Sequence, residues 1–329
     1  MGKSAVGKNM PEKKLKIVYH LEAGPWLGAR IAEIAERENL DIAVVAESDV
    51  AGFEAALADV DVLLHTLVPV TARHIANAPS LRLIQKVGVG VNTIDLEAAR
   101  ARLIPVCNMP GSNSRAVMEA TLLLMLACLR RLPYFETLIR RGEGWNWPPA
   151  IQDSLGELSG RTVGLAGYGT VPTLLAPVLV AMGARVIYAS RSEKPGAVGT
   201  RVDKATLLSQ SDILSLHMPL TDETSQWLDR EALGLMKPGA ILVNTARGGL
   251  VDEAALVAAL RGGHLRGAGL DVFEVEPVSR DNPLLSLDNV VLVPHLAYFT
   301  VETLERGLVI ALDNINRLRE GRELVHRVA

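Results

Sequence analysis

The sequence has few cysteines and no long uninterrupted apolar run, and both absences restrict what the protein can be. Only Cys107 and Cys128 occur among 329 residues, in apolar surroundings and without the spacing of metal ligands. They are expected to be reduced, buried thiols of a cytosolic protein rather than a disulfide or a metal site. No stretch of about 18 uncharged apolar residues is present, so no segment is expected to span a membrane.

A strong excess of one charge is also missing. The chain has 34 Lys and Arg against 37 Asp and Glu, a formal net charge of -3, which gives no reason to expect nucleic acid or an anionic membrane as partner. The basic segment 1–16 lacks a following apolar region and cleavage site, so it is interpreted as a lead-in and not as a signal peptide. The remaining composition, 49% apolar and 22% charged, is typical of a soluble globular protein long enough for two domains.

From residue 15 onward, short apolar runs alternate with amphipathic stretches. Bounded runs of this kind, separated by helices, are typical of βα units and a parallel sheet. A long apolar helix is predicted over 113–132, with Pro133 at or just beyond its end, and a Trp-rich loop over 142–149. The strands predicted before that helix lie within 15–20, 41–46, 59–67, 81–90 and 104–108.

The βα rhythm restarts at residue 162. A final amphipathic helix is predicted over 300–321, and periodicity leaves open which domain it joins. The sequence therefore predicts an α/β protein with two parallel-sheet domains. Six strands are predicted in the second series, within 162–169, 184–190, 212–218, 240–246, 267–273 and 289–295.

A glycine turn opens the second series. Gly167-Tyr168-Gly169 follows a predicted strand and precedes a predicted helix. Glycine permits the tight turn and lets pyrophosphate oxygens approach the amides at the helix N-terminus, so a dinucleotide site is predicted here; a βα turn that binds nothing is the alternative. Pro172 replaces the third glycine of the fingerprint. Because proline is tolerated in a first helical turn, we expect a slightly displaced helix rather than a lost site.

The end of the next predicted strand indicates which dinucleotide binds. NAD sites usually present a carboxylate to the ribose 2′-hydroxyl about 20 residues beyond the glycines. This chain has Ser190-Arg191-Ser192 there, and a hydroxyl beside a guanidinium would bind a 2′-phosphate through charge-assisted hydrogen bonds. NADP is therefore predicted in preference to NAD. Glu193 opposes this interpretation, and a merely solvated Arg191 is the alternative.

Four charged or titratable residues follow later predicted strands. Arg247 lies in NTARGGLVDE, Asp271 and Glu276 lie in GAGLDVFEVEP, and His295 lies in VVLVPHLAY. Ligands of open parallel sheets bind outside the carboxyl ends of the strands, so these side chains are expected to converge. The alternatives are a structural histidine, an arginine at a helix end and a loop carboxylate.

Taken together, these motifs resemble those of the D-isomer-specific 2-hydroxyacid dehydrogenases from about residue 15 onward. The resemblance implies a substrate domain of 1–108 plus 298–329, a dinucleotide-binding Rossmann domain of 109–297, and an active site in the cleft between these Rossmann-like or flavodoxin-like domains. The residues that carry it are KVGVG at 86–90 with Ile94-Asp95, Asn108 with Pro110-Gly111, the turn at 164–169, SLHMPLT, MKPGAILVNTARGGLVDE, LDVFEVEP and VPH.

The resemblance also implies roles. Arg247 would hold the substrate carboxylate and carbonyl oxygen, His295 would exchange the proton, and Glu276 would fix the histidine tautomer and raise its pKa. The amides of Val89 and Gly90 would receive the substrate carboxylate. No metal is expected. The predicted cofactor-binding positions are Gly167, Tyr168, Gly169, Thr170, Val171, Ser190, Arg191, Ser192, His217, Pro219, Thr245, Ala246, Asp271 (near the nicotinamide amide) and His295.

Among the reactions of this family, reduction of glyoxylate or hydroxypyruvate best fits two features: the NADP-type residues Ser190-Arg191-Ser192 and the Trp-rich loop. His65 stands where phosphoglycerate enzymes carry arginine, which argues against phosphoglycerate. A homodimer through the coenzyme domain is implied, with Trp145 and Trp147 as interface candidates. The rival interpretations are a dinucleotide-sensing corepressor-like binding protein and a phosphoglycerate, formate or phosphite dehydrogenase of the same fold.

Overall fold

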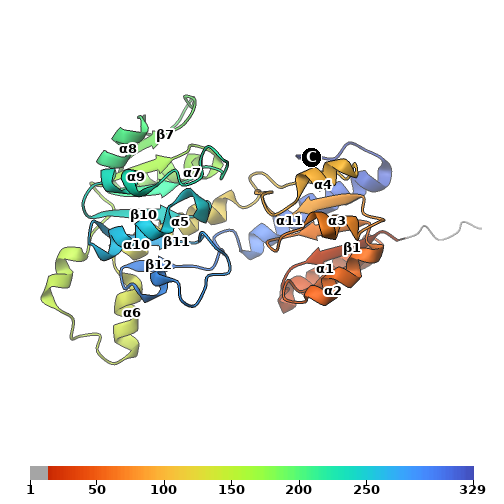
Figure 1. The fold of residues 1–329 in the computed structure, drawn as a ribbon, viewed down its shortest axis with the longest axis horizontal. Coiled ribbons are helices and arrows are strands. Elements are labelled where there is room, and N and C mark those ends of the chain that lie inside the picture. The colour runs from red at the N-terminus through yellow and green to blue at the C-terminus, as the bar shows by residue number, and fades with distance from the viewer. Residues whose placement is uncertain (1–13) are drawn as a thin grey trace, which may run out of the picture. The chain divides into compact units, whose positions relative to one another are not determined.

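The computed structural model describes residues 14–329 and divides them into two compact units (Figure 1). Unit 1 is the chain up to Ser112 together with Val301–Ala329, and unit 2 is Asn113–Thr300. The chain therefore passes between units at 112/113 and 300/301, a few residues beyond the predicted 108/109 and 297/298. The interpretation of segment 1–16 falls almost wholly on residues 1–13, which lie outside the described part.

Unit 1 contains a five-stranded parallel sheet. Its order, β2-β1-β3-β4-β5, is that of flavodoxin-like doubly wound folds and confirms the prediction of a parallel sheet. All five strands coincide with predicted apolar runs. Four of them are largely buried, whereas the edge strand β2 has no buried residue. They are β1 Lys16–His20, β2 Asp41–Val45, β3 Val62–His65, β4 Leu83–Lys86 and β5 Val106–Cys107.

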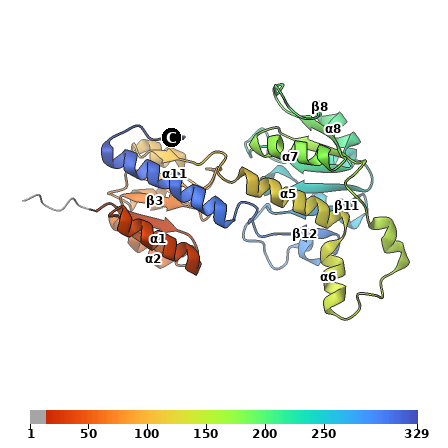
Figure 2. The same cartoon turned by 180° about the vertical axis from the view of Figure 1, so that it is seen from behind.

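Helices cover both faces of this sheet. On one face, α1 (Pro25–Arg37) packs beside α11 (Val301–Glu320), and on the other lie α2 (Val50–Ala56), α3 (Ala72–Ala76) and α4 (Leu96–Ala101). Figure 2 shows α1 and α11 on the same side of unit 1. The last helix therefore returns to unit 1, which its periodicity alone did not decide.

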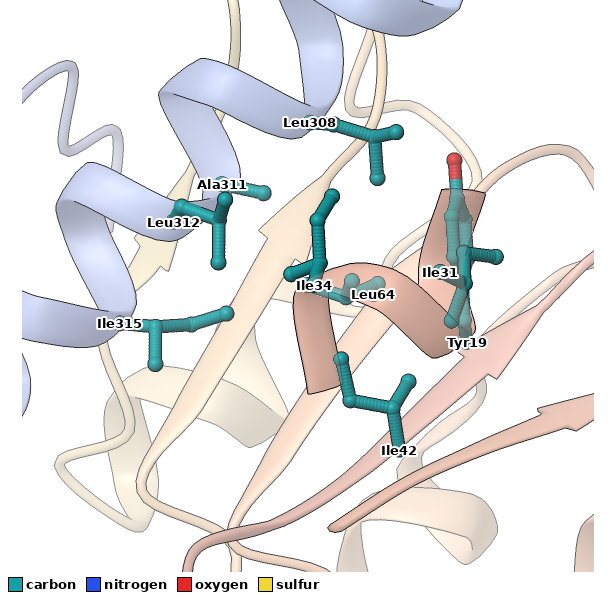
Figure 3. Close-up of a pocket in the computed structure, with 9 residues that line it drawn as sticks. All are labelled: Tyr19, Ile31, Ile34, Ile42, Leu64, Leu308, Ala311, Leu312 and Ile315. Atoms are coloured by element: carbon teal, nitrogen blue, oxygen red, sulfur yellow. The ribbon is translucent and has the colours of Figure 1, made fainter. Parts of the chain in front are cut away.

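A small cavity lies between α1, α11 and the sheet (Figure 3). Its walls are aliphatic side chains and the ring of Tyr19, so it is a gap in core packing rather than a site with polar groups for a ligand. The other lining residues are Ile31, Ile34, Ile42, Leu64, Leu308, Ala311, Leu312 and Ile315.

Unit 2 contains a seven-stranded parallel sheet in the order β12-β11-β10-β9-β6-β7-β8. Numbered from β6, this is 3-2-1-4-5-6-7, the Rossmann order, in which the direction of winding changes between β6 and β9. The six predicted strands are confirmed, whereas β8, two exposed polar residues, carries no apolar signal and was not predicted. The strands are β6 Thr162–Ala166, β7 Arg185–Ala189, β8 Thr200–Arg201, β9 Ile213–Leu216, β10 Ala240–Asn244, β11 Leu265–Leu270 and β12 Val290–Leu292.

The helices of unit 2 also occupy both faces of its sheet. One core cluster joins α5 (Ser114–Leu129) and α7 (Thr170–Ala181) to the sheet, and a second joins α8 (Lys204–Gln210), α9 (Arg230–Leu235) and α10 (Glu253–Arg261). Among residues 14–329, no helix has both the length and the apolar character needed to cross a bilayer.

The segment after α5 differs from the prediction. The long helix ends at Leu129, Arg131 adopts a left-handed conformation with φ 49°, and a separate helix α6 (Leu132–Arg140) begins with Pro133 in its first turn. Proline fits this position because its missing N–H is unpaired there anyway, so it starts a helix instead of only following one. None of the residues of α6 is buried, and the segment leads away from the sheet of unit 2 (Figures 1 and 2).

Candidate active site

The glycine turn after β6 lies at the point where the sheet of unit 2 changes direction. Gly167 has φ 93°, and a Cβ atom there would lie 2.7 Å from the carbonyl oxygen of His217, so only glycine fits. At Gly169, which precedes α7, no described atom lies within 4 Å of a Cβ position. No side-chain hydrogen bond from the described residues caps this helix. Its first amides, at Thr170 and Val171, therefore fit an anion such as pyrophosphate.

The predicted ribose-binding residues follow β7 at the same edge. The Ser190 hydroxyl donates to the Ser192 carbonyl oxygen at 2.6 Å, and the Arg191 side chain is exposed. Sequence reasoning missed Arg201 on β8, whose guanidinium donates to the carbonyl oxygens of Ser190 (2.9 Å) and Arg191 (3.3 Å). Arg201 reaches this position because it pairs with Tyr188 of the neighbouring strand. The pairing belongs to β8, a strand too short to be predicted from the sequence.

His217 follows β9 on the other side of the turn. Its Nε2 pairs with the Ser215 hydroxyl at 2.9 Å, and burial lowers the pKa of the imidazole to about 3. The ring is therefore neutral near pH 7 and is poorly suited to act as an acid or base there. Pro219 follows it along the chain. Thr245, after β10, is buried and its hydroxyl lies 2.9 Å from that of Thr121 on α5, and Ala246 comes next.

His295 and Glu276 form a direct pair. The Nδ1 atom of His295 lies 2.7 Å from Oε2 of Glu276, and Oε1 of Glu276 accepts the Phe273 N–H at 2.9 Å. Burial tends to raise the pKa of Glu276, but the hydrogen bond and charge of His295 outweigh it and leave that pKa below its ordinary value. The carboxylate therefore fixes the imidazole and leaves Nε2 for a proton transfer.

Asp271 anchors the turn that presents His295. His295 adopts φ 54°, and its N–H donates to the Asp271 carbonyl oxygen at 2.7 Å. The N–H groups of Leu296 and Ala297 donate to the Asp271 carboxylate at 2.8 and 3.0 Å. Burial raises the pKa of Asp271 to about 6. These three bonds hold a conformation that is uncommon for a residue other than glycine, a role that the sequence did not indicate.

Arg247 follows β10 beside these groups. Burial lowers its pKa, and the negative charges of Glu276 and Asp271 raise it, so the guanidinium stays protonated among carboxylates. Gly248 permits this proximity, because a Cβ atom there would lie 1.9 Å from the carbonyl carbon of Phe273. The structure therefore brings a guanidinium, an imidazole and its carboxylate partner to one edge of unit 2, where they can hold an anionic oxygen and transfer a proton.

Val89 and Gly90 belong to unit 1, in the loop after β4. Val89 is 40% exposed, and its carbonyl oxygen accepts a hydrogen bond from Nδ2 of Asn108 at 2.8 Å. Behind this loop, His65 is fully buried with Nε2 2.9 Å from the Thr93 hydroxyl, and Lys86 is 5% exposed. Burial holds the pKa of His65 well below its ordinary value. This buried polar group was not expected, because His65 stood alone in the sequence.

Residues 122–297 match the family model described as D-isomer specific 2-hydroxyacid dehydrogenase, NAD binding domain. The chain is 42% identical to a glyoxylate reductase of Aeropyrum pernix over 75% of this chain and 76% of the relative. It is 41% identical to a D-3-phosphoglycerate dehydrogenase of Mycobacterium tuberculosis over 77% of this chain but only 48% of that protein.

Among solved structures, the chain resembles an NADPH-dependent glyoxylate/hydroxypyruvate reductase of Sinorhizobium meliloti, determined with NADP and malonate. The two share 30% identity with a TM-score of 0.80, and the match covers 96% of this chain and 97% of that one. The likeness therefore extends over both units.

Proposed function

The chain belongs to the D-isomer specific 2-hydroxyacid dehydrogenase family, a family of NAD(P)-dependent oxidoreductases, and from this premise we propose that it reduces glyoxylate or hydroxypyruvate with NADPH. The observation that carries the proposal is the 2.7 Å contact between His295 Nδ1 and Glu276 Oε2 beside the Arg247 guanidinium. A surface histidine with no chemical role would not need a supporting carboxylate and a neighbouring half-buried cation.

The proposed reaction assigns one task to each side chain. The bound nicotinamide supplies the hydride. Arg247 binds the carboxylate and carbonyl oxygen of the 2-keto acid and stabilises the negative charge that develops on that oxygen. His295 gives the proton from Nε2 to the oxygen during reduction and takes it back during oxidation. Glu276 holds the imidazole through Nδ1. Val89 and Gly90 of unit 1 are proposed to receive the substrate carboxylate through their amides.

Preference for NADP is supported by the residues after β7. The strand is followed by Ser190, Arg191 and Ser192, so no carboxylate stands in the position that usually binds a ribose 2′-hydroxyl. Arg201 adds a second guanidinium beside this segment. Two cations and a hydroxyl favour a 2′-phosphate. The named NADPH-dependent reductase of Sinorhizobium meliloti is consistent with this proposal.

The substrate is proposed to be a small, unphosphorylated acid. His65 is 0% exposed and its pKa is held well below the ordinary value, so it offers no cation to a phosphate. Phosphoglycerate is the second candidate, because relatives of that name match 77% of this chain.

A homodimer through unit 2 is also proposed. Apolar side chains lie exposed along α6 and the loop after it: Leu132 is 54%, Ile139 56% and Trp145 93% exposed, and Trp147 follows in the same loop. Exposed apolar groups of this kind mark interaction surfaces, and pairing with a second copy would bury them. Both cysteines are free and buried, which supports a reducing compartment and hence the cytoplasm.

Steady-state oxidation of NADPH and NADH with glyoxylate, hydroxypyruvate, pyruvate, phenylpyruvate and 3-phosphohydroxypyruvate tests this proposal. We expect the highest kcat/KM with NADPH and glyoxylate or hydroxypyruvate. Turnover with 3-phosphohydroxypyruvate alone would replace the substrate proposal with the phosphoglycerate reaction. Dinucleotide binding without turnover of any acid would favour a corepressor-like binding protein.

A further inference from the structure

The Tyr168 side chain, in the middle of the glycine turn, is directed into the protein and contacts the segment that follows β7. It is 7% exposed. Its hydroxyl donates to the carbonyl oxygen of Val198 at 2.9 Å and accepts the N–H of the same residue at 2.9 Å. The ring packs on Tyr188 of β7, with centroids 4.3 Å apart. One side chain of the turn thus satisfies both backbone groups of a residue 30 positions away.

Segment 190–198 is held at its other end by Arg201. Nη2 of Arg201 lies 2.9 Å from the Ser190 carbonyl oxygen and 3.3 Å from that of Arg191, and Nε lies 3.2 Å from that of Ser190. Gly199 closes the segment with φ 112°, where a Cβ atom would lie 2.8 Å from the Val186 carbonyl oxygen. The backbone around Arg191 is therefore held from both sides, by Tyr168 of the glycine turn and by Arg201 of β8.

We infer that Tyr168 and Arg201 are positioning residues that set selectivity for a 2′-phosphorylated dinucleotide by holding segment 190–198 in place. This inference rests on the proposed preference for NADP. The Arg191 side chain is long and exposed, so its contribution to phosphate binding depends on a fixed main chain beneath it. Because the Tyr168 side chain is directed into the protein, only its main chain would face the pyrophosphate that NAD and NADP share, and Tyr168→Phe leaves that main chain in place.

The physical basis is preorganisation. A phosphate bound by Ser190 and Arg191 orders their side chains, and the affinity is larger when the backbone is already ordered. The Tyr168 hydroxyl makes two hydrogen bonds with the backbone of Val198, one as donor and one as acceptor. A phenylalanine would keep the ring packing on Tyr188 and lose both bonds, so Tyr168→Phe separates positioning from core packing.

Calorimetric titration with two nucleotide fragments tests the inference without turnover. Adenosine 2′,5′-bisphosphate carries the 2′-phosphate, and adenosine 5′-monophosphate lacks it. We expect wild-type protein to bind the bisphosphate more tightly and Tyr168→Phe to weaken that binding about 3- to 10-fold, as for the loss of one or two hydrogen bonds, with the monophosphate changed less than about 2-fold. Hydrogen exchange of peptides spanning 190–199 should become faster in the variant.

Matched variants complete the test. Tyr188→Phe removes a hydroxyl from the same ring pair, for which no hydrogen bond is found in the described part of the chain, and should leave both affinities unchanged. Arg201→Lys keeps the charge but cannot bond two carbonyl oxygens as a fork, so it should lower bisphosphate affinity as Tyr168→Phe does. Arg201 is exposed, so Arg201→Lys should fold normally. This variant can therefore test the inference even if Tyr168→Phe folds poorly.

The outcomes separate the two ideas. A wild-type protein that binds both nucleotides equally would overturn the proposed NADP preference and this inference with it. A wild type that prefers the bisphosphate, together with unchanged selectivity in Tyr168→Phe and Arg201→Lys, would overturn the positioning roles alone. Arg191→Ala should lose the preference for the bisphosphate without faster hydrogen exchange in 190–199. That result would assign Arg191 to direct phosphate contact and agree with positioning by Tyr168 and Arg201.

Discussion

Burial and hydrogen bonding together give the two carboxyl groups of one sequence motif opposite pKa shifts. Asp271 and Glu276 are five positions apart, yet Asp271 has a pKa raised to about 6 by burial, and the pKa of Glu276 is lowered by its bond to His295. The Asp271 carboxylate accepts backbone N–H groups of the turn that presents His295, whereas the Glu276 carboxylate contacts the imidazole. The two carboxylates of one motif thus have different roles: Asp271 fixes the backbone and Glu276 fixes the imidazole.

The raised pKa of Asp271 predicts a stability that depends on pH. An unfolded aspartate titrates near 3.9, so the native protein holds more protons than the unfolded chain between about pH 4 and 6. Stability from this group therefore falls as pH rises through that window. Asp271→Asn has no titrating group at this position, so its stability does not fall in this way. The difference in free energy of unfolding, variant minus wild type, should therefore rise by up to about 3 kcal/mol from pH 4 to pH 7. Urea unfolding at both pH values measures it, and a difference independent of pH would contradict the assigned pKa.

His217 should not contribute a proton-transfer step. Because burial lowers its pKa to about 3, the ring is neutral across the pH range of activity. His217→Asn is expected to raise KM for NADPH and to leave the midpoint of the pH profile of kcat where it is in wild type. A shifted midpoint would identify His217 as a titrating participant.

At the scale of elements, the site depends on backbone segments that approach each other closely. Gly248→Ala would force the turn after β10 away from Phe273 and Arg247 away from the carboxylates, so we expect a loss of about 2–4 kcal/mol in unfolding free energy and of most activity. Gly234→Ala on α9 is the control, because its Cβ position is open and alanine favours a helix. Equal thermal stability of the two variants would show that the close approach does not matter.

The sequence predicted elements where local pattern and burial agree. The apolar runs of β1, β3 to β7 and β9 to β12 follow from that rule, whereas β2 has the apolar pattern without burial. The expectation that Arg247, Glu276 and His295 converge follows from their positions after parallel strands. The rule fails for β8 and α6. Thr200–Arg201 has no apolar residue, and Pro133, predicted at or just beyond the end of one helix, lies in the first turn of another. The anchoring by Asp271 and the contact of Tyr168 with Val198 join residues through tertiary structure, for which local sequence holds no signal.

At the scale of the whole molecule, the exposed apolar side chains of α6 predict assembly. Ile139→Asp places a charge on that surface and should convert a dimer to a monomer, measured by light scattering after size-exclusion chromatography. Leu103→Asp is a matched control, because Leu103 is 87% exposed on unit 1 and lies outside the proposed interface. A mass equal to that of one chain for wild type, or an unchanged dimer in Ile139→Asp, would contradict assembly through α6.

His295, supported by Glu276, is proposed to give the proton to a 2-keto acid that is reduced beside Arg247. Single-turnover oxidation of bound NADPH by glyoxylate, followed by absorbance in wild type and His295→Asn, tests it most directly. We predict a rate about 10²- to 10⁴-fold lower in the variant, with the affinity for NADPH largely preserved. A variant that reduces glyoxylate at the wild-type rate would contradict the account.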